Sequence, residues 1–121
     1  MKQYVISLAL LIAAPVAFPT SHANAQSQAE MNRQAAKDFE KADADLNSTY
    51  AALMAKLPDA ESKRKLKESQ RAWIAFRDAE TAFAADQVRA GSAAPVLRSA
   101  SMTQTTEQRI RQFKADFPMA E

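Results

Sequence analysis

The segment Gln70–Glu80, which reads QRAWIAFRDAE, sets the only tryptophan of the chain among charged residues at helical spacing. Trp73 and Phe76 lie three residues apart, Trp73 and Arg77 four apart, and Arg77 and Glu80 three apart. An α-helix would therefore gather bulky apolar and ionic side chains on adjoining stripes. Such a stripe either packs against a neighbouring helix or recognises a ligand.

Apolar residues continue the helical period on both sides of this segment. Upstream, an apolar seam recurs at alternating steps of four and three, at Met31, Ala35, Phe39, Ala42, Leu46, Tyr50, Leu53 and Leu57. Ser27–Glu30 forms a capping box that should start this first helix, and Pro58 should end it. So long a helix needs a partner along its length. We expect that partner to be the second helix, from about Ala60 to Arg89, with Asp59 as its N-cap. Its inward face should carry Leu66, Gln70, Trp73, Phe76 or Arg77, Glu80, Phe83 and Val88.

A third helix is expected after the second. Gly91 should end the second helix in a left-handed conformation, and Ser92–Pro95 should form a turn. The inward stripe of the third helix would be Leu97, Met102, Thr106, Ile110, Phe113 and Phe117. No run of alternating β-branched residues is long enough to predict a strand. The sequence therefore predicts an all-α fold, a small antiparallel bundle of three or four helices built on a long helical hairpin.

The N-terminal stretch has the composition of a secretory signal peptide. Lys2 supplies a basic start, Val5–Ala17 an apolar segment, and Ala23–Ala25 small residues at the cleavage positions. Prolines interrupt the apolar run, which is shorter than the roughly 20 residues of a membrane span. We expect residues 1–25 to be removed and residues 26–121 to form one domain, periplasmic or secreted, without stable membrane insertion.

Several kinds of chemistry are excluded by the residues that this domain lacks. The only histidine, His22, lies in the expected signal peptide, and the chain has no cysteine. Histidine-dependent and cysteine-dependent nucleophiles and the usual zinc and copper sites are therefore missing. The single glycine, Gly91, excludes glycine-rich phosphate loops. We expect a protein that is not an enzyme, with no catalytic residues, no metal site and no cofactor.

The charge balance argues against a nucleic-acid partner. Loss of Lys2 leaves the domain close to neutral, whereas phosphate binding requires lysine and arginine in clear excess. One basic cluster, Lys63–Lys67, is flanked by Glu61 and Glu68, which is typical of a solvated helix face.

The central segment has two interpretations. Trp73 is either a core aromatic residue or a ligand contact. Arg77 and Glu80 form either a partly buried ion pair that fixes helix register or a polar notch for a ligand, and Gln70 and Arg109 could join either arrangement. Burial of these side chains would make them scaffold, whereas an exposed aromatic patch would mark a site.

At these motifs the chain resembles the LprI-type lysozyme inhibitor family. The stretches that carry the resemblance are AEMNRQAA (29–36), ADADLNSTYAAL (42–53), QRAWIAFRDAE (70–80), Gly91-Ser92, Pro95 and Thr106-x-x-Arg109. The family motif falls on Met31, Asn32, Leu46, Asn47, Tyr50, Gln70, Trp73, Arg77, Asp78, Glu80 and Arg109. The resemblance implies an exported helical domain whose named activity is the blocking of lysozymes by protein binding.

The same resemblance implies disulfides that this chain lacks. Family members usually carry cysteines where this chain has Gln34, Thr81 and Ser101. Loss of a bridge typically costs about 2–5 kcal/mol in a small secreted domain, so helix packing must compensate.

A loop between the second and third helices is the candidate partner-contact segment. Within residues 90–101 and next to them, the candidate contact residues are Arg89, Gly91, Ser92, Arg98, Ser99 and Ser101. An inhibitor must fill a cleft in which two carboxylates act on a sugar, and small polar residues with protruding arginines suit that task. The other interpretation is an ordinary connection between helices. The alternative function is a non-inhibitory binding or structural module that contacts another envelope protein.

Overall fold

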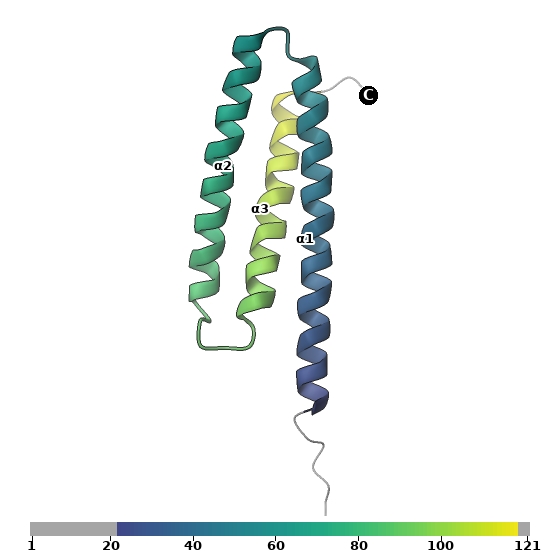
Figure 1. Cartoon of the computed structure of the whole chain (residues 1–121), viewed down its shortest axis with the longest axis vertical. Coiled ribbons are helices and arrows are strands. Elements are labelled where there is room, and N and C mark those ends of the chain that lie inside the picture. The colour runs from purple at the N-terminus through teal and green to yellow at the C-terminus, as the bar shows by residue number, and fades with distance from the viewer. Residues whose placement is uncertain (1–21, 119–121) are drawn as a thin grey trace, which may run out of the picture.

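The computed structural model describes residues 22–118, which form three α-helices. They are α1 (His22–Lys56), α2 (Ala60–Asp86) and α3 (Ala94–Asp116). The chain runs along α1, returns along α2 and reverses again into α3, so α1 and α3 are parallel (Figure 1). The predicted all-α bundle is confirmed, and no helix in this part of the chain has the length and hydropathy of a membrane span.

The turn between α1 and α2 forms as the sequence predicts. Pro58 follows the end of α1, and Asp59 adopts an extended backbone and caps α2. The Asp59 carboxylate accepts a hydrogen bond from the backbone N–H of Ser62 at 2.7 Å. Hydrogen bonds from Ser62 hold the pKa of Asp59 below its usual value, because they favour the charged form.

The predicted start of the first helix is wrong. α1 begins at His22, so the Ser27–Glu30 quartet lies inside a continuous helix and does not start it. The expected signal peptide falls mainly in residues 1–21, which lie outside the described residues. Cleavage after Ala25 would leave Gln26 as the first residue of α1.

The connection between α2 and α3 also differs from the prediction. α2 ends at Asp86, and Gly91 is not left-handed, since no residue of the described chain has a positive φ. Successive right-handed turns carry the chain forward, with the Gly91 N–H donating to the Val88 carbonyl at 2.7 Å. α3 then begins at Ala94 and includes Pro95 in its first turn, where the missing N–H of proline is tolerated.

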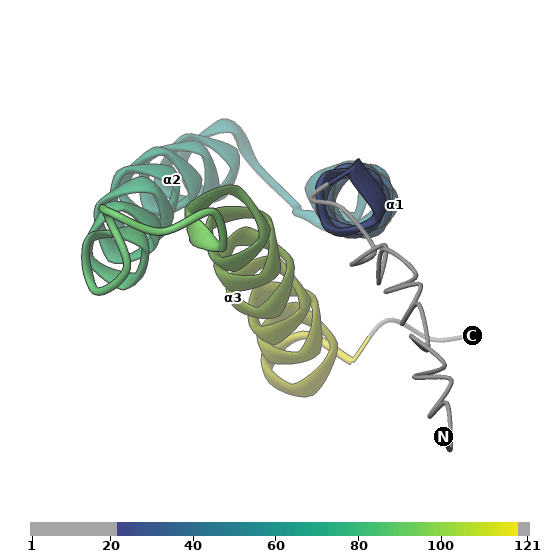
Figure 2. The ribbon, with the colours of Figure 1, turned by 90° about the horizontal axis from the view of Figure 1, so that it is seen from below.

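The third helix packs against both other helices, whereas α1 and α2 make no extensive contact with each other. Figure 2 shows α1 nearly end-on, with α2 and α3 inclined to its axis. The expectation that α2 would be the partner of α1 is therefore wrong, and α3 fills that role. In the apolar cluster, Phe113 of α3 joins Leu46 and Leu53 of α1, and Leu66 of α2 completes it.

The core is small and partly polar. Its buried apolar residues are Ala42, Leu46, Leu53, Leu66, Ala85 and Phe113. Its buried polar residues are Thr81, Thr105, Thr106 and Arg109. Tyr50, Trp73 and Ile110 pack against the apolar cluster from its edge. Polar side chains thus occupy positions that a larger bundle would fill with aliphatic groups.

Several residues predicted to face inward are exposed instead: Met31, Phe76, Glu80, Phe83, Leu97 and Phe117. Met31 is exposed because α1 has 35 residues and α3 only 23, so the start of α1 extends past the α2–α3 connection (Figure 1). On α2, the inward stripe passes through Thr81 and Ala85, which turns Glu80 and Phe83 outward.

Two buried threonines give a direct test of this packing. The hydroxyls of Thr81 and Thr106 have no hydrogen-bond partner among the described residues. Thr81→Val and Thr106→Val keep the side-chain shape and remove the unsatisfied group, so each should raise the free energy of unfolding by about 1 kcal/mol. Urea denaturation followed by circular dichroism measures this change.

Thr105→Val is the matched control for these two variants. Thr105 is also buried, but its hydroxyl donates to the Ser101 carbonyl at 2.9 Å. Its replacement should not stabilise the protein. Equal effects at all three positions would contradict the assignment of the unpaired hydroxyls.

Candidate functional site

Trp73 of α2 is half-buried and lies against two arginines. The guanidinium carbon of Arg77 is 5.3 Å from the Trp73 ring centroid, and that of Arg109 is 5.8 Å away. Cation–π contacts of this kind contribute about 0.5–2 kcal/mol, more when they are desolvated. Arg109, which the sequence left as a possible member of the central arrangement, thus lies against Trp73.

Arg77 links α2 to α1. Its side chain is 11% exposed and pairs with Asp43 of α1 at 3.6 Å and with its neighbour Asp78 at 3.2 Å. Its guanidinium also lies 5.5 Å from the ring centroid of Phe39 in α1. Because the two helices make no extensive backbone contact, a long side chain is needed to reach across.

The predicted ion pair between Arg77 and Glu80 is wrong. Glu80 is exposed, and the salt bridges that Arg77 makes within the described chain are those with Asp43 and Asp78. Sequence reasoning missed Asp43 as a partner, although it lies next to Ala42 of the predicted seam. A contact between two helices leaves no spacing pattern within either helix. Only the position of Asp43 beside the apolar seam could have indicated that it pairs with Arg77.

Arg109 of α3 is 8% exposed and bonds only neutral acceptors. It donates to Gln70 Oε1 at 3.1 Å, Gln112 Oε1 at 2.7 Å and Ser69 Oγ at 3.0 Å. Its guanidinium carbon lies 4.3 Å from the ring centroid of Phe113. Burial lowers the pKa of Arg109 from its usual value, and the charge of Asp116 partly opposes that shift. This side chain ties α3 to α2.

Trp73, Arg77 and Arg109 together form what we call the Trp73 cluster. Their contacts hold the three helices together, so the cluster is part of the scaffold. Leu46 is in the core, Tyr50 packs against it, and half-buried Asn32 accepts a hydrogen bond from Gln28. The remaining motif residues, Met31, Asn47, Asp78 and Glu80, are exposed. Within residues 22–118, no group of three or more histidine, cysteine or acidic side chains could hold a metal ion.

A second arrangement lies on the outer side of α2 and α3, and we call it the α2–α3 face. It consists of the exposed residues Phe76, Phe83 and Leu97 together with a groove of about 360 Å³. Phe76, Glu80 and Ala84 of α2 line this groove, and α3 lines the other side from Leu97 to Gln108. Phe76 and Phe83 are seven residues apart and thus share one side of α2. Sequence reasoning placed Phe83 inside, and it placed either Phe76 or Arg77 inside.

Comparison with known proteins assigns the chain to a family. A family model described as lysozyme inhibitor LprI matches residues 20–113. The chain belongs to the LprI family. The expected family membership is confirmed, and the match spans every residue to which the family motif was carried over.

A curated protein is similar to this chain over most of its length. An uncharacterized protein of Rhizobium meliloti (strain 1021) is 32% identical over 109 residues, which cover 80% of this chain and 78% of that protein. No solved structure matches the chain.

The predicted contact loop of this LprI chain is shorter than expected. Arg89, Gly91 and Ser92 lie in the connection at 87–93, but Arg98, Ser99 and Ser101 lie in α3. Arg89 extends into solvent and pairs with Asp86 at 3.2 Å. Ser101 lines the groove of the α2–α3 face.

Substitution of Arg77 tests its role as a link between helices. Arg77→Ala should lower the free energy of unfolding by about 2 kcal/mol, because it removes packing on Trp73 and Phe39 as well as charge. Arg77→Lys should fall between Arg77→Ala and the unchanged protein, since lysine keeps the charge but lacks the planar group. Urea denaturation followed by circular dichroism measures both.

Asp43→Asn separates the ion pair from the stacking. Asp43 is 43% exposed and 3.6 Å from Arg77, so its loss should cost less than about 1 kcal/mol. If Asp43→Asn cost as much as Arg77→Ala, the ion pair rather than the ring contacts would hold the two helices.

Proposed function

We propose that this protein is an exported lysozyme inhibitor that acts by binding lysozyme through the α2–α3 face and the adjoining 87–93 connection. The observation that carries the proposal is the family match over residues 20–113. Inhibition by binding also suits a domain whose charged motif residues, Arg77 and Arg109, are engaged in holding helices together.

The choice of surface rests on exposed aromatic side chains. Phe83 is 65% exposed and Phe76 is 55% exposed, which makes them the most exposed aromatic residues of the described chain. Large aromatic anchors and arginines dominate the binding energy of protein interfaces. Arg89 of the connection and Arg98 of α3 are exposed, and a guanidinium can form paired hydrogen bonds with a carboxylate. The two carboxylates of a lysozyme cleft are suitable acceptors.

The proposed export of the protein can be tested separately from inhibition. If residues 1–25 are a cleaved signal peptide, protein recovered from the periplasm or medium should begin at Gln26. Intact-mass spectrometry of the exported protein measures this directly. Recovery of the full-length chain in the cytoplasm, with none exported, would contradict the proposed location.

Inhibition is tested by titration of the exported protein into lysozyme while cell-wall lysis is followed by turbidity. The proposal predicts inhibition that saturates at about one inhibitor per lysozyme, for a c-type enzyme or another class. Phe76→Ser combined with Phe83→Ser should weaken inhibition by at least tenfold, because loss of two anchors exceeds about 1.4 kcal/mol.

Ile74→Ser is the matched control for this titration. Ile74 is 39% exposed on α2, but it lies two residues from Phe76 and therefore on another side of the helix. Its replacement should leave inhibition unchanged. Absence of inhibition by a large excess of folded protein, with every lysozyme class tried, would overturn the proposal and favour a non-inhibitory envelope-binding module.

A further inference from the structure

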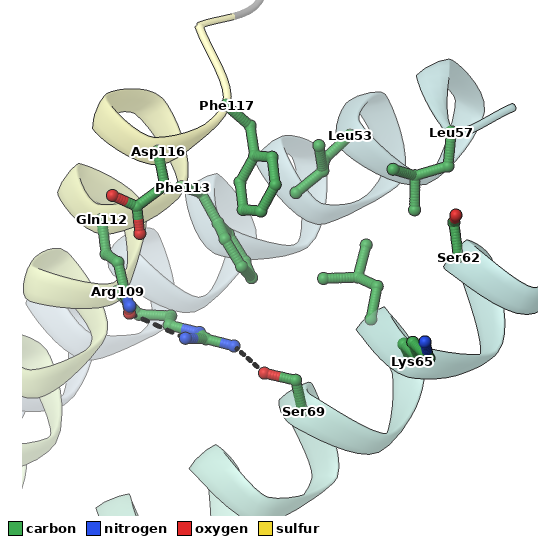
Figure 3. Close-up of a pocket in the computed structure, with 11 residues that line it drawn as sticks. Leu53, Leu57, Ser62, Lys65, Ser69, Arg109, Gln112, Phe113, Asp116 and Phe117 are labelled. Carbon is green, nitrogen blue, oxygen red and sulfur yellow. Dashed lines mark hydrogen bonds between the residues drawn. The ribbon is translucent and has the colours of Figure 1, made fainter.

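A second cleft opens next to the α1–α2 turn, and Figure 3 shows the side chains that line it. Its volume is about 430 Å³, which lies within the roughly 300–1,000 Å³ of small-molecule sites. All three helices contribute to it. Its apolar walls are Leu53, Leu57, Leu66, Phe113 and Phe117. Leu53, Leu66 and Phe113 also belong to the buried core, whereas Phe117 is 45% exposed and Leu57 is half-buried.

One cation lies in the wall of this cleft. Arg109 lines it and reaches from α3 toward Ser69 of α2 (Figure 3). Its acceptors are a serine hydroxyl and two glutamine oxygens, and no described carboxylate lies within 4.0 Å of its nitrogens. A buried guanidinium is normally paired with an anion, because its desolvation is costly. The cleft therefore contains a buried positive charge that no described carboxylate approaches to salt-bridge distance.

Two further charged residues lie in the lining. Lys65 of α2 is 70% exposed and can approach an anion from the solvent side. Asp116 of α3 is exposed and lines the cleft on the side of Gln112 (Figure 3). It influences Arg109 through space, but it does not reach salt-bridge distance. Asp116 should therefore weaken the binding of an anion without preventing it.

We propose that this cleft binds a small amphiphilic carboxylate of the medium-chain fatty acid class. Its head would accept hydrogen bonds from the N–H groups of Arg109 that Gln70, Gln112 and Ser69 leave unused. Its alkyl chain would lie between Phe113, Phe117 and the leucines of α1 and α2. The apolar side chains of the lining favour an alkyl chain over a bare anion. The single buried cation favours a ligand with one charged head.

The sole tryptophan provides a reporter for this site. Trp73 lies 5.8 Å from the Arg109 guanidinium carbon, so a carboxylate on Arg109 should change its fluorescence. Decanoate, kept below its micelle concentration, is titrated into the exported protein, and calorimetry gives the stoichiometry. The proposal predicts saturation at about one decanoate per chain. Acetate, which has no tail, and decanol, which has no charge, should each bind at least about tenfold more weakly.

Substitutions on α3 test the head position. Arg109→Gln should weaken decanoate binding by at least about tenfold. Asp116→Asn should tighten it about two- to tenfold, because a like charge is removed. The second variant changes an exposed side chain and so tests the site even if Arg109→Gln unfolds the protein. Arg111→Gln is the matched control, since Arg111 is exposed and lines a different pocket, and it should have no effect.

Three results would overturn the proposal. Decanol that binds as tightly as decanoate would show that the charge is not recognised. If Asp116→Asn left the affinity for decanoate unchanged, the carboxylate head would not lie at this end of the cleft. A short peptide with a free C-terminal leucine that binds tighter than decanoate would assign the cleft to a peptide terminus instead. None of these assays contains lysozyme, so they succeed or fail independently of the inhibitor proposal.

Discussion

α3 lies between the other two helices, and the packing of this one helix determines how the rest of the structure is held. α1 and α2 make no extensive contact, so each is fixed mainly by what α3 offers it. Phe113 completes the apolar cluster with Leu46 and Leu53 of α1, while Arg109 bonds Ser69 and Gln70 of α2. In a chain without cysteine, these contacts take the place that a disulfide would have in a small exported domain.

The separation of α1 from α2 explains the remaining features. Only a side chain as long as Arg77 links them at the level of Asp43 and Phe39. The inclined helices also leave two open surfaces, the α2–α3 face at one end and the cleft beside Arg109 at the other. Arg77 and Arg109, the buried charges of the family motif, therefore serve the scaffold, and the proposed lysozyme contacts fall to residues that the packing leaves uncovered.

Periodicity predicted the helices and much of the core, because burial along one helix repeats every three or four residues. Leu46 and Phe113 were placed correctly, and so was the Asp59 cap. The rotation of α2 was not predictable, since a stripe from Trp73 through Arg77 can continue equally to Glu80 or to Thr81. Contacts between helices, such as that of Arg109 with Ser69, could not be predicted either, because residues 40 positions apart share no local sequence pattern.

Hydrogen–deuterium exchange of residues 26–121, alone and saturated with lysozyme, tests the central claim that lysozyme binds where packing leaves the helices open. The account predicts slower exchange in α2 from about residue 76, in the 87–93 connection and in the first half of α3, with α1 unchanged. Protection confined to α1, or none at full occupancy, would contradict it.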